Sequence, residues 1–113
     1  MPASPHPGRP VRGSRTGIPI MALLDLLGRR WSLRVLWELA HAPGPTFREL
    51  QGRCGGVSSS VLSARLGELT GAGVVMRGER GYELTADGRT LVDDLAPLND
   101  WAKRWARRTG AGT

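Results

Sequence analysis

The feature that most constrains this chain is a segment that is apolar on almost every side of a helix. Residues 30–41 (RWSLRVLWELAH) carry apolar side chains around most of the helical circumference and leave one narrow polar stripe, formed by Arg34, Glu38 and His41. Such a helix is stable in water only when other helices surround it. The sequence therefore predicts a helical domain with residues 30–41 at its centre, and the Pro-Gly-Pro of residues 43–45 ends this helix.

Shorter helices are expected on both sides of this central segment. Residues 18–27 form an apolar helix, because Gly28 follows at a favoured C-cap position. Residues 47–53 and 58–70 form two more, and the short turn between them contains two adjacent glycines. Helix, glycine-containing turn and helix are the pattern of a helix-turn-helix motif.

A hairpin and a long helix complete the ordered part of the chain. Residues 74–76 and 82–85 read as two strands around the tight turn of residues 78–81. A small hairpin directly after a helix-turn-helix is a wing. Residues 85–108 then repeat apolar side chains at alternating spacings of four and three, which is a heptad-like seam. Pro97 lies inside this segment, so we expect either a kink or two helices, the second with Pro97 in its first turn.

The two ends of the chain differ from this domain. Residues 1–17 hold four prolines, three glycines and three arginines without apolar periodicity, and they are predicted to be a disordered basic tail. Residues 109–113 are expected to be a flexible C-terminus. The domain between them, residues 18–108, is predicted to be mainly α with a small β-hairpin. It is a winged helix-turn-helix with added N- and C-terminal dimerisation helices.

The charge of the chain favours a polyanionic partner. The formal net charge is +6, and every one of the sixteen basic residues except Lys103 is an arginine, whose planar fork suits phosphate and guanine. No segment has the apolar length that a bilayer crossing needs, and the N-terminal residues lack the apolar core of a secretory signal. The single cysteine, Cys54, excludes an intrachain disulfide framework and a multi-cysteine metal site. We therefore expect a soluble, cytoplasmic protein without a metal or another cofactor.

The outer face of residues 58–70 suits the major groove of DNA. Leu62, Leu66 and Leu69 fall within one narrow arc that faces the core, so the serines and small residues point the other way. The expected DNA-contacting residues of this helix are Ser58, Ser59, Ser60, Ser63, Ala64 and Arg65. Hydroxyl groups bond phosphates or base edges, but they discriminate weakly between bases. We therefore expect DNA shape and phosphate contacts to contribute much of the specificity.

Further arginines are expected at the DNA surface. They lie at the wing turn and at the start of the central helix: Arg77, Arg80, Arg29 and Arg30. A helix start also offers backbone amides to a phosphate. Arg65 either reaches the DNA or braces the fold by pairing with Glu49, and the sequence leaves both open. Arg34 is expected to pair with Glu38, four residues on.

Several motifs in this order resemble the HxlR family of regulators, which are winged-helix relatives of the MarR group. The matching residues are Gly28-Arg29-Arg30-Trp31, Phe47-Arg48-Glu49-Leu50, Val57-Ser58, Leu62, Arg65-Leu66, Leu69, Gly73-Val74, Arg77, Leu84-Thr85-Ala86-Asp87-Gly88 and Trp101. The resemblance covers residues 18–102. It implies a dimeric, DNA-binding transcription factor without enzymatic activity.

Three features of the sequence depart from the family pattern. Many members carry a sensing cysteine before the proline that opens the first helix, but here Ile18 precedes Pro19, so the usual thiol switch is missing. The wing is shorter than the usual hairpin. Thr46 replaces an arginine that often precedes the family's phenylalanine, and Arg48 is the candidate to replace that phosphate contact. Cys54 is then the one redox candidate, and a small buried core cysteine is the simpler interpretation.

A homodimer is expected from the need for burial as well as from the resemblance. A domain of about 90 residues buries only about two-thirds of its unfolded surface, and the last helix carries more apolar length than such a core covers. The expected interface residues are Leu23, Leu27, Leu91, Leu95, Leu98, Trp101 and Trp105. Pairing places two recognition helices about one DNA turn apart, which predicts a pseudo-palindromic site on double-stranded DNA. By analogy with relatives, we expect an effector pocket between the first and last helices of the dimer, for a ligand that the sequence does not name.

Two other classes of function compete with this prediction. An enzyme would need a nucleophile, a base and an orienting group, and Cys54 and His41 have no obvious partners of that kind, so no catalytic residue is expected. A dimeric protein-interaction module or antirepressor, using the same fold without specific DNA binding, stays open. The serine-rich face lacks asparagine and glutamine, which are strong base readers.

Overall fold

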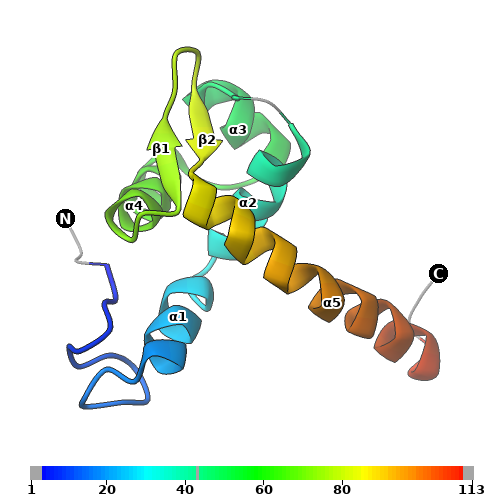
Figure 1. The fold of residues 1–113 in the computed structure, drawn as a ribbon. Coiled ribbons are helices and arrows are strands. Elements are labelled where there is room, and N and C mark those ends of the chain that lie inside the picture. The colour runs from blue at the N-terminus through cyan, green and yellow to red at the C-terminus, as the bar shows by residue number, and fades with distance from the viewer. Residues whose placement is uncertain (1–3, 43, 111–113) are drawn as a thin grey trace.

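The computed structural model describes residues 4–42 and 44–110, and within them it shows five helices and one two-stranded sheet (Figure 1). The elements are α1 (Pro19–Leu27), α2 (Ser32–His41), α3 (Phe47–Cys54), α4 (Ser59–Gly71), β1 (Val75–Arg77), β2 (Tyr82–Leu84) and α5 (Ala86–Arg108). The predicted mainly helical fold with a small hairpin is confirmed.

Helix α2 is at the centre of the core, as its apolar sequence predicts. It packs against α1, α3, α4, α5 and β2, and Val35 and Leu36 are completely enclosed. One side of α2 is open, however, because Leu33 and Trp37 are each about half exposed. The neighbouring elements therefore cover most of the apolar circumference but leave one strip of it at the surface.

The ends of α3 and α4 follow from their capping residues. The Thr46 side chain accepts a hydrogen bond from the Glu49 amide (3.2 Å), and the Glu49 carboxylate accepts one from the Thr46 amide (2.9 Å), which is a capping box. Gly55 has a left-handed φ of 62° where α3 ends. Ser58 then caps α4 by accepting a hydrogen bond from the Val61 amide (3.2 Å). These local bonds define the predicted helix-turn-helix.

The wing is a short antiparallel hairpin that follows α4. Val75 pairs with Leu84, and both side chains are buried in the core. The turn is closed by a hydrogen bond from the Gly78 amide to the Gly81 carbonyl (2.7 Å), as the sequence predicts. The hairpin projects upward in Figure 1, beside α3 and α4.

Helix α5 begins tightly against the wing. Thr85 caps it by accepting a hydrogen bond from the Gly88 amide (3.0 Å), and its hydroxyl donates to the Gly73 carbonyl (2.6 Å). A Cβ on Gly88 would lie only 2.1 Å from the Val74 carbonyl oxygen, so this close approach requires glycine. The start of α5 is therefore fixed to the end of α4.

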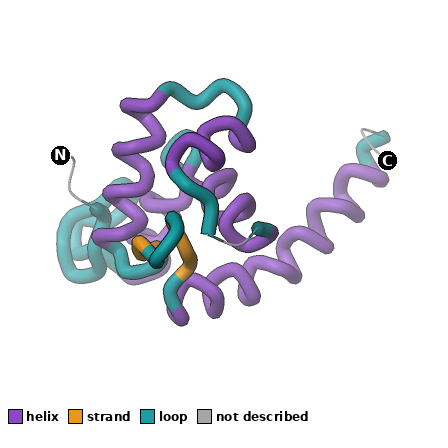
Figure 2. The backbone as a smooth tube through the Cα atoms, turned by 90° about the horizontal axis from the view of Figure 1, so that it is seen from above, coloured by secondary structure: helices purple, strands orange, loops and turns teal. Residues whose placement is uncertain are grey.

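The second half of α5 extends away from the rest of the domain (Figures 1 and 2). The first half packs against α2 and β2. Pro97 lies within one continuous helix of 23 residues, so the alternative of two separate helices is wrong. Proline lacks only one amide hydrogen, and the bonds of its neighbours maintain the helix around it. In the described part of the chain, no helix combines the length and the apolar character that a membrane crossing needs.

Residues 4–17 do not match the prediction of a disordered tail. They form turns that fold back toward α1 and α4, with a hydrogen bond from the Gly8 amide to the Gly17 carbonyl (3.0 Å). The Ser4 hydroxyl donates to the Glu68 carbonyl of α4 (2.7 Å). These bonds join residues far apart in the sequence, so the proline- and arginine-rich composition of the segment does not reveal them.

Candidate nucleic-acid interface

Helix α4 carries its leucines inward and its serines outward. Leu62, Leu66 and Leu69 are at most 3% exposed and belong to the core. The residues at the surface are Ser58, Ser59, Ser60 and Ser63, with Ala64 half-buried beside them. The structure thus brings together on one face the small and hydroxyl-bearing residues that were predicted to meet DNA.

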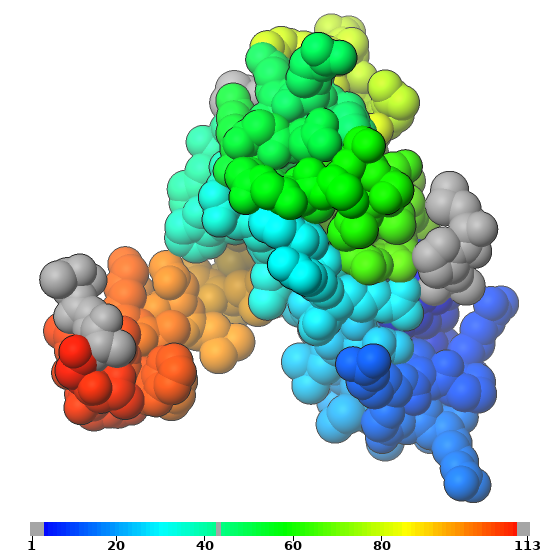
Figure 3. All heavy atoms as spheres, turned by 180° about the vertical axis from the view of Figure 1, so that it is seen from behind, coloured from blue at the N-terminus to red at the C-terminus, as the bar shows by residue number. Residues whose placement is uncertain are grey.

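Helix α4, which carries this polar face, lies beside the wing. In Figure 1 the wing and α3 occupy the upper part, with α4 beside them, while α1 and α5 form the lower part. Seen from behind, α1 and α5 extend downward in different directions from the part of the molecule that contains α4 (Figure 3). A nucleic acid on α4 and the wing would therefore leave the far parts of α1 and α5 free for other contacts.

The tip of the wing is attached to α3 by Arg80. Its guanidinium lies 2.8 Å from the Glu49 carboxylate and donates to the Gly44 carbonyl (3.1 Å), yet the side chain is still mostly exposed. The pKa of Glu49 is lowered chiefly by the hydrogen bond from the Thr46 amide; desolvation opposes this effect, and the charge and hydrogen bond of Arg80 lower the pKa further. The wing therefore has a defined position relative to the helix-turn-helix.

Arg65 does not pair with Glu49, so that part of the prediction is wrong. Its Nη1 lies 2.5 Å from a Glu68 oxygen, and its Nε donates to the Arg30 carbonyl (2.8 Å). Glu49 pairs instead with Arg80 of the wing (2.8 Å). Arg65 does brace the fold, one of the two alternatives left open by the sequence, but through a different acid.

Glu68 is the residue of this region that sequence reasoning missed. Its side chain is only 1% exposed, and its second oxygen accepts a hydrogen bond from Arg29 (2.7 Å). Arg29 also lies 3.9 Å from Asp25. One buried carboxylate thus engages two arginines that were predicted to contact DNA. A helical wheel does not reveal this burial, because Glu68 lies about 100° from Leu69 and outside the arc of Leu62, Leu66 and Leu69.

Other predicted basic residues point outward. Arg30 and Arg48 are exposed, and the Arg30 guanidinium lies 5.7 Å from the Trp31 ring. Arg77 is exposed beside the Tyr82 ring, at 5.1 Å. The predicted pair of Arg34 with Glu38 is confirmed, at 2.8 Å. Exposed positive charge is therefore present in the turn before α2, on α3 and on the wing.

Comparison with known proteins identifies the family. Residues 26–110 match the sequence model of a family described as HxlR-like helix-turn-helix. The chain belongs to the HxlR family. It is a transcriptional regulator, a class of protein that is not an enzyme, and membership implies DNA binding. The family resemblance predicted from the sequence is confirmed.

Relatives and solved structures agree with this assignment. The HTH-type transcriptional regulator YvaP of Bacillus subtilis is 32% identical over 89 residues, which are 73% of this chain and 82% of the relative. The regulator BH0655 of Halalkalibacterium halodurans is 31% identical over 90 residues, 74% of this chain and 80% of the relative. The structure of quinone-bound YodB from B. subtilis aligns with a TM-score of 0.70 at 27% identity and covers 75% of this chain and 96% of YodB.

The redox candidate of this HxlR-family protein, Cys54, is enclosed at the end of α3. It is 3% exposed and contributes to the hydrophobic core. Burial raises the pKa of the Cys54 thiol, so the reactive thiolate is disfavoured. A buried, protonated thiol of this kind packs as a small apolar side chain.

The projecting half of α5 carries three large apolar side chains that are exposed to solvent in this HxlR-family protein. Leu98, Trp101 and Trp105 are 60%, 47% and 52% exposed, and the two indole rings stack with centroids 5.9 Å apart. Leu91 and Leu95, nearer the body, are half-buried. This surface contains most of the residues that were predicted to form the dimer interface.

The contribution expected from α1 needs correction. Leu27 is 7% exposed and lies in the core, and Leu23 is half-buried against that core. The apolar side chains that α1 presents to solvent are Ile20 and Leu24, each 53% exposed. The prediction assigned the wrong side of α1 to the surface. Because α1 is apolar on both sides, only packing decides which side turns inward.

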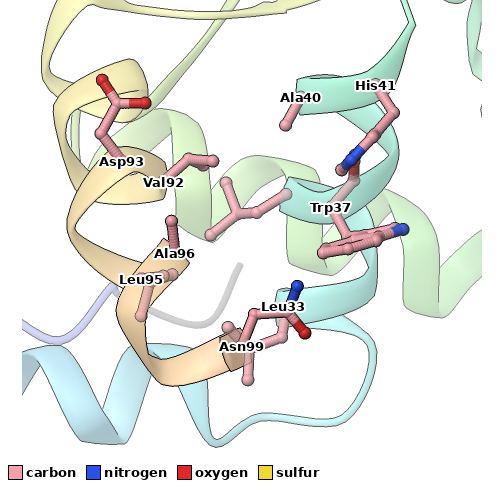
Figure 4. Close-up of a pocket in the computed structure, with 10 residues that line it drawn as sticks. Leu33, Trp37, Ala40, His41, Val92, Asp93, Leu95, Ala96 and Asn99 are labelled. Carbon is pink, nitrogen blue, oxygen red and sulfur yellow. The ribbon is translucent and has the colours of Figure 1, made fainter. Parts of the chain in front are cut away.

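An apolar groove lies between α2 and α5. Its volume is about 500 Å³, and its walls include Leu33 and Trp37 from α2 and Val92, Leu95 and Asn99 from α5 (Figure 4). This position differs from the predicted effector pocket, which was placed between the first and last helices. The groove continues the open side of α2 toward the exposed surface of α5.

Proposed function

We propose that this HxlR-family protein is a cytoplasmic, homodimeric regulator that binds specific double-stranded DNA. In this proposal α4 enters the major groove and the wing lies on the backbone. The observation that carries it is the exposed serine face of α4, Ser59, Ser60 and Ser63, anchored by buried leucines beneath it. Hydroxyl groups at the N-terminal end of a recognition helix reach base edges and phosphates, and the half-buried Ala64 allows a close approach.

The basic residues take two different roles in the proposal. Arg30, Arg48 and Arg77 are exposed, and in this proposal they contact phosphates. Arg80 is exposed but tied to Glu49, so it positions the wing while its outer edge faces the backbone. This division reduces the set of direct DNA contacts relative to the sequence prediction, because it assigns the arginines bound to Glu68 to the support of α4.

The apolar surfaces of α1 and α5 support the dimer. Leu98, Trp101 and Trp105 on α5, with Ile20 and Leu24 on α1, are exposed in the single chain. In Figure 1, α1 and the far half of α5 extend away from the wing. A symmetric dimer uses the same patch on both subunits. Burying this patch places two α4 helices on one side of the dimer, which fits a pseudo-palindromic site with half-sites about one DNA turn apart.

A salt titration on DNA selected from a random library tests this function. A dimer with about 6–10 phosphate contacts loses about three to five decades of affinity between 50 and 200 mM salt. Ser63→Glu places a negative charge in the groove and is expected to weaken binding at least about a hundredfold, because like charges at an interface cost several kcal/mol. Thr90→Glu, at an exposed position on α5, is the matched control and keeps the wild-type affinity.

The same experiment identifies the competing function. A response that does not change with salt, or a selection that enriches no DNA, would favour a protein-interaction module built on the same fold. This alternative stays in view because the α4 face offers serines and no asparagine or glutamine.

A further inference from the structure

We propose that Glu68 sets the orientation of α4 relative to α1, and through it the specificity of DNA binding. The inference rests on the proposed function, because α4 is the helix assigned to the major groove. Glu68 does not contact DNA in this proposal. It is a positioning residue that acts through Arg29 and Arg65.

The first support is the completeness of the buried cluster. The Glu68 carboxylate is 1% exposed, and each of its oxygens has one arginine partner, Arg29 at 2.7 Å and Arg65 at 2.5 Å. Arg65 in turn donates to the carbonyl of Arg30 (2.8 Å). Two of these contacts cross from α4 to the turn between α1 and α2. A carboxylate this deeply buried is retained only when its charge and lone pairs are satisfied, as they are here.

The second support is the kind of contact that the cluster adds to the core. The leucines of α4 pack into the core by apolar contact, which is non-directional and allows a helix to rotate or slide slightly. Charge-assisted hydrogen bonds to a planar guanidinium have a defined direction and restrict both movements. The cluster therefore supplies the directional restraint on the angle of α4.

The third support is the position of the turn between α1 and α2, to which the cluster binds α4. The turn that carries Arg29 ends at Trp31, whose φ of 79° is a conformation that a bulky side chain adopts only when its surroundings hold it there. The same turn follows α1, on which Ile20 and Leu24 belong to the proposed dimer surface. A restraint from α4 to this turn thus links the recognition helix to the helix that faces the second subunit.

The charge balance of the cluster predicts a specific signature. Two arginines surround one carboxylate, and replacing Glu68 with glutamine leaves an acceptor oxygen for only one of them. The substitution therefore weakens the directional restraint without removing positive charge near the DNA. General attraction to phosphates then persists, whereas the alignment of the serine face with base edges is lost. The variant should lose affinity for its selected site and keep its affinity for random DNA.

The first experiment measures the ratio of affinities for selected and random DNA at one salt concentration. Glu68→Gln is expected to reduce the ratio at least about tenfold, consistent with the large effect of breaking a buried ion pair. The control is Asp94→Asn, which makes the same change of charge at an exposed position on α5 and should leave the ratio within about twofold. Circular dichroism at the assay temperature establishes that the variants are folded.

The second experiment measures orientation without DNA. Spin labels at Ile20→Cys on α1 and Ser63→Cys on α4, in a Cys54→Ala background diluted with unlabelled protein, report the α1–α4 distance within one chain. We expect a narrow distribution with Glu68 and a broader or shifted one with Glu68→Gln. A residue that only stabilises the fold would leave the distribution of the folded protein unchanged.

If Glu68→Gln does not fold, a milder variant, Arg29→Lys, and its control, Arg34→Lys, test the same role. Arg29→Lys keeps the charge but loses the planar fork, and it should lower the affinity ratio and broaden the distances to a smaller degree. Arg34→Lys changes an exposed ion pair on α2 in the same way and should change neither.

The outcomes separate the two proposals. Folded Glu68→Gln or Arg29→Lys protein with the wild-type affinity ratio, or with unchanged distances, overturns the positioning role while the proposed function stands. A wild-type protein that prefers no DNA overturns the proposed function and the claim about specificity. In that case broadened distances in the variant still support the orientation of α4 by Glu68.

Discussion

Replacing Trp105 with alanine tests whether the projecting half of α5 is a dimer surface. In the single chain Trp105 is 52% exposed. A tryptophan buries about 150–250 Å², so about 100 Å² per copy is available to a partner and about 200 Å² in a symmetric dimer. At about 25 cal/mol per Å² this area corresponds to about 5 kcal/mol as an upper bound.

The expected effect is smaller than this bound, because the association also orders side chains and desolvates polar groups. We expect the dimer to lose about 2–3 kcal/mol, and its dissociation constant to rise about 30- to 140-fold. Sedimentation velocity over a dilution series measures this constant. Circular dichroism should show little change in helix content, because Trp105 lies outside the hydrophobic core.

Met76→Ala is the control for this prediction. Met76 is also apolar and 43% exposed, but it lies on β1 of the wing and not on the projecting half of α5. Its replacement should leave the dissociation constant unchanged. A Trp105→Ala protein that dimerises as tightly as wild type, or a Met76→Ala protein weakened to the same degree, would refute the assignment of the interface to α5.

Three further predictions concern α4, α3 and the wing. Leu62 is completely buried, so Leu62→Ala should lower the free energy of unfolding by about 2–5 kcal/mol in urea, whereas Leu62→Met should cost less than about 1.5 kcal/mol; equal losses would contradict this packing. Because burial raises the pKa of Cys54, a thiol reagent at neutral pH should modify it slowly in native protein and rapidly in urea, and equal rates would show an accessible thiol. The lowered pKa of Glu49 means that its contacts stabilise the fold above its ordinary pKa of 4.5 and are lost as the pH falls through the lower folded value. An NMR titration of the Glu49 carboxyl group should therefore have a midpoint below 4.5, and Arg80→Gln should shift that midpoint upward. A midpoint at or above 4.5 in the wild-type protein would contradict the contacts of Glu49 with Thr46 and Arg80.

Local patterns in the sequence were sufficient to predict the elements of the fold. The helices predicted at residues 47–53, 58–70 and 85–108 correspond to α3, α4 and α5, because helical periodicity depends on residues only three or four apart in the chain. The central position of residues 30–41 followed from the apolar circumference of that segment. The outward direction of the serines followed from the leucine spacing on the same helix.

Only the tertiary structure decided which distant groups meet. Arg29 and Glu68 are 39 residues apart in the sequence, and neither the pairing nor its depth has a local signal. The same holds for the path of residues 4–17 and for the side of α1 that turns Leu27 inward. The physical reason is that sequence periodicity determines which residues share a face, whereas the packing of whole helices determines what that face touches.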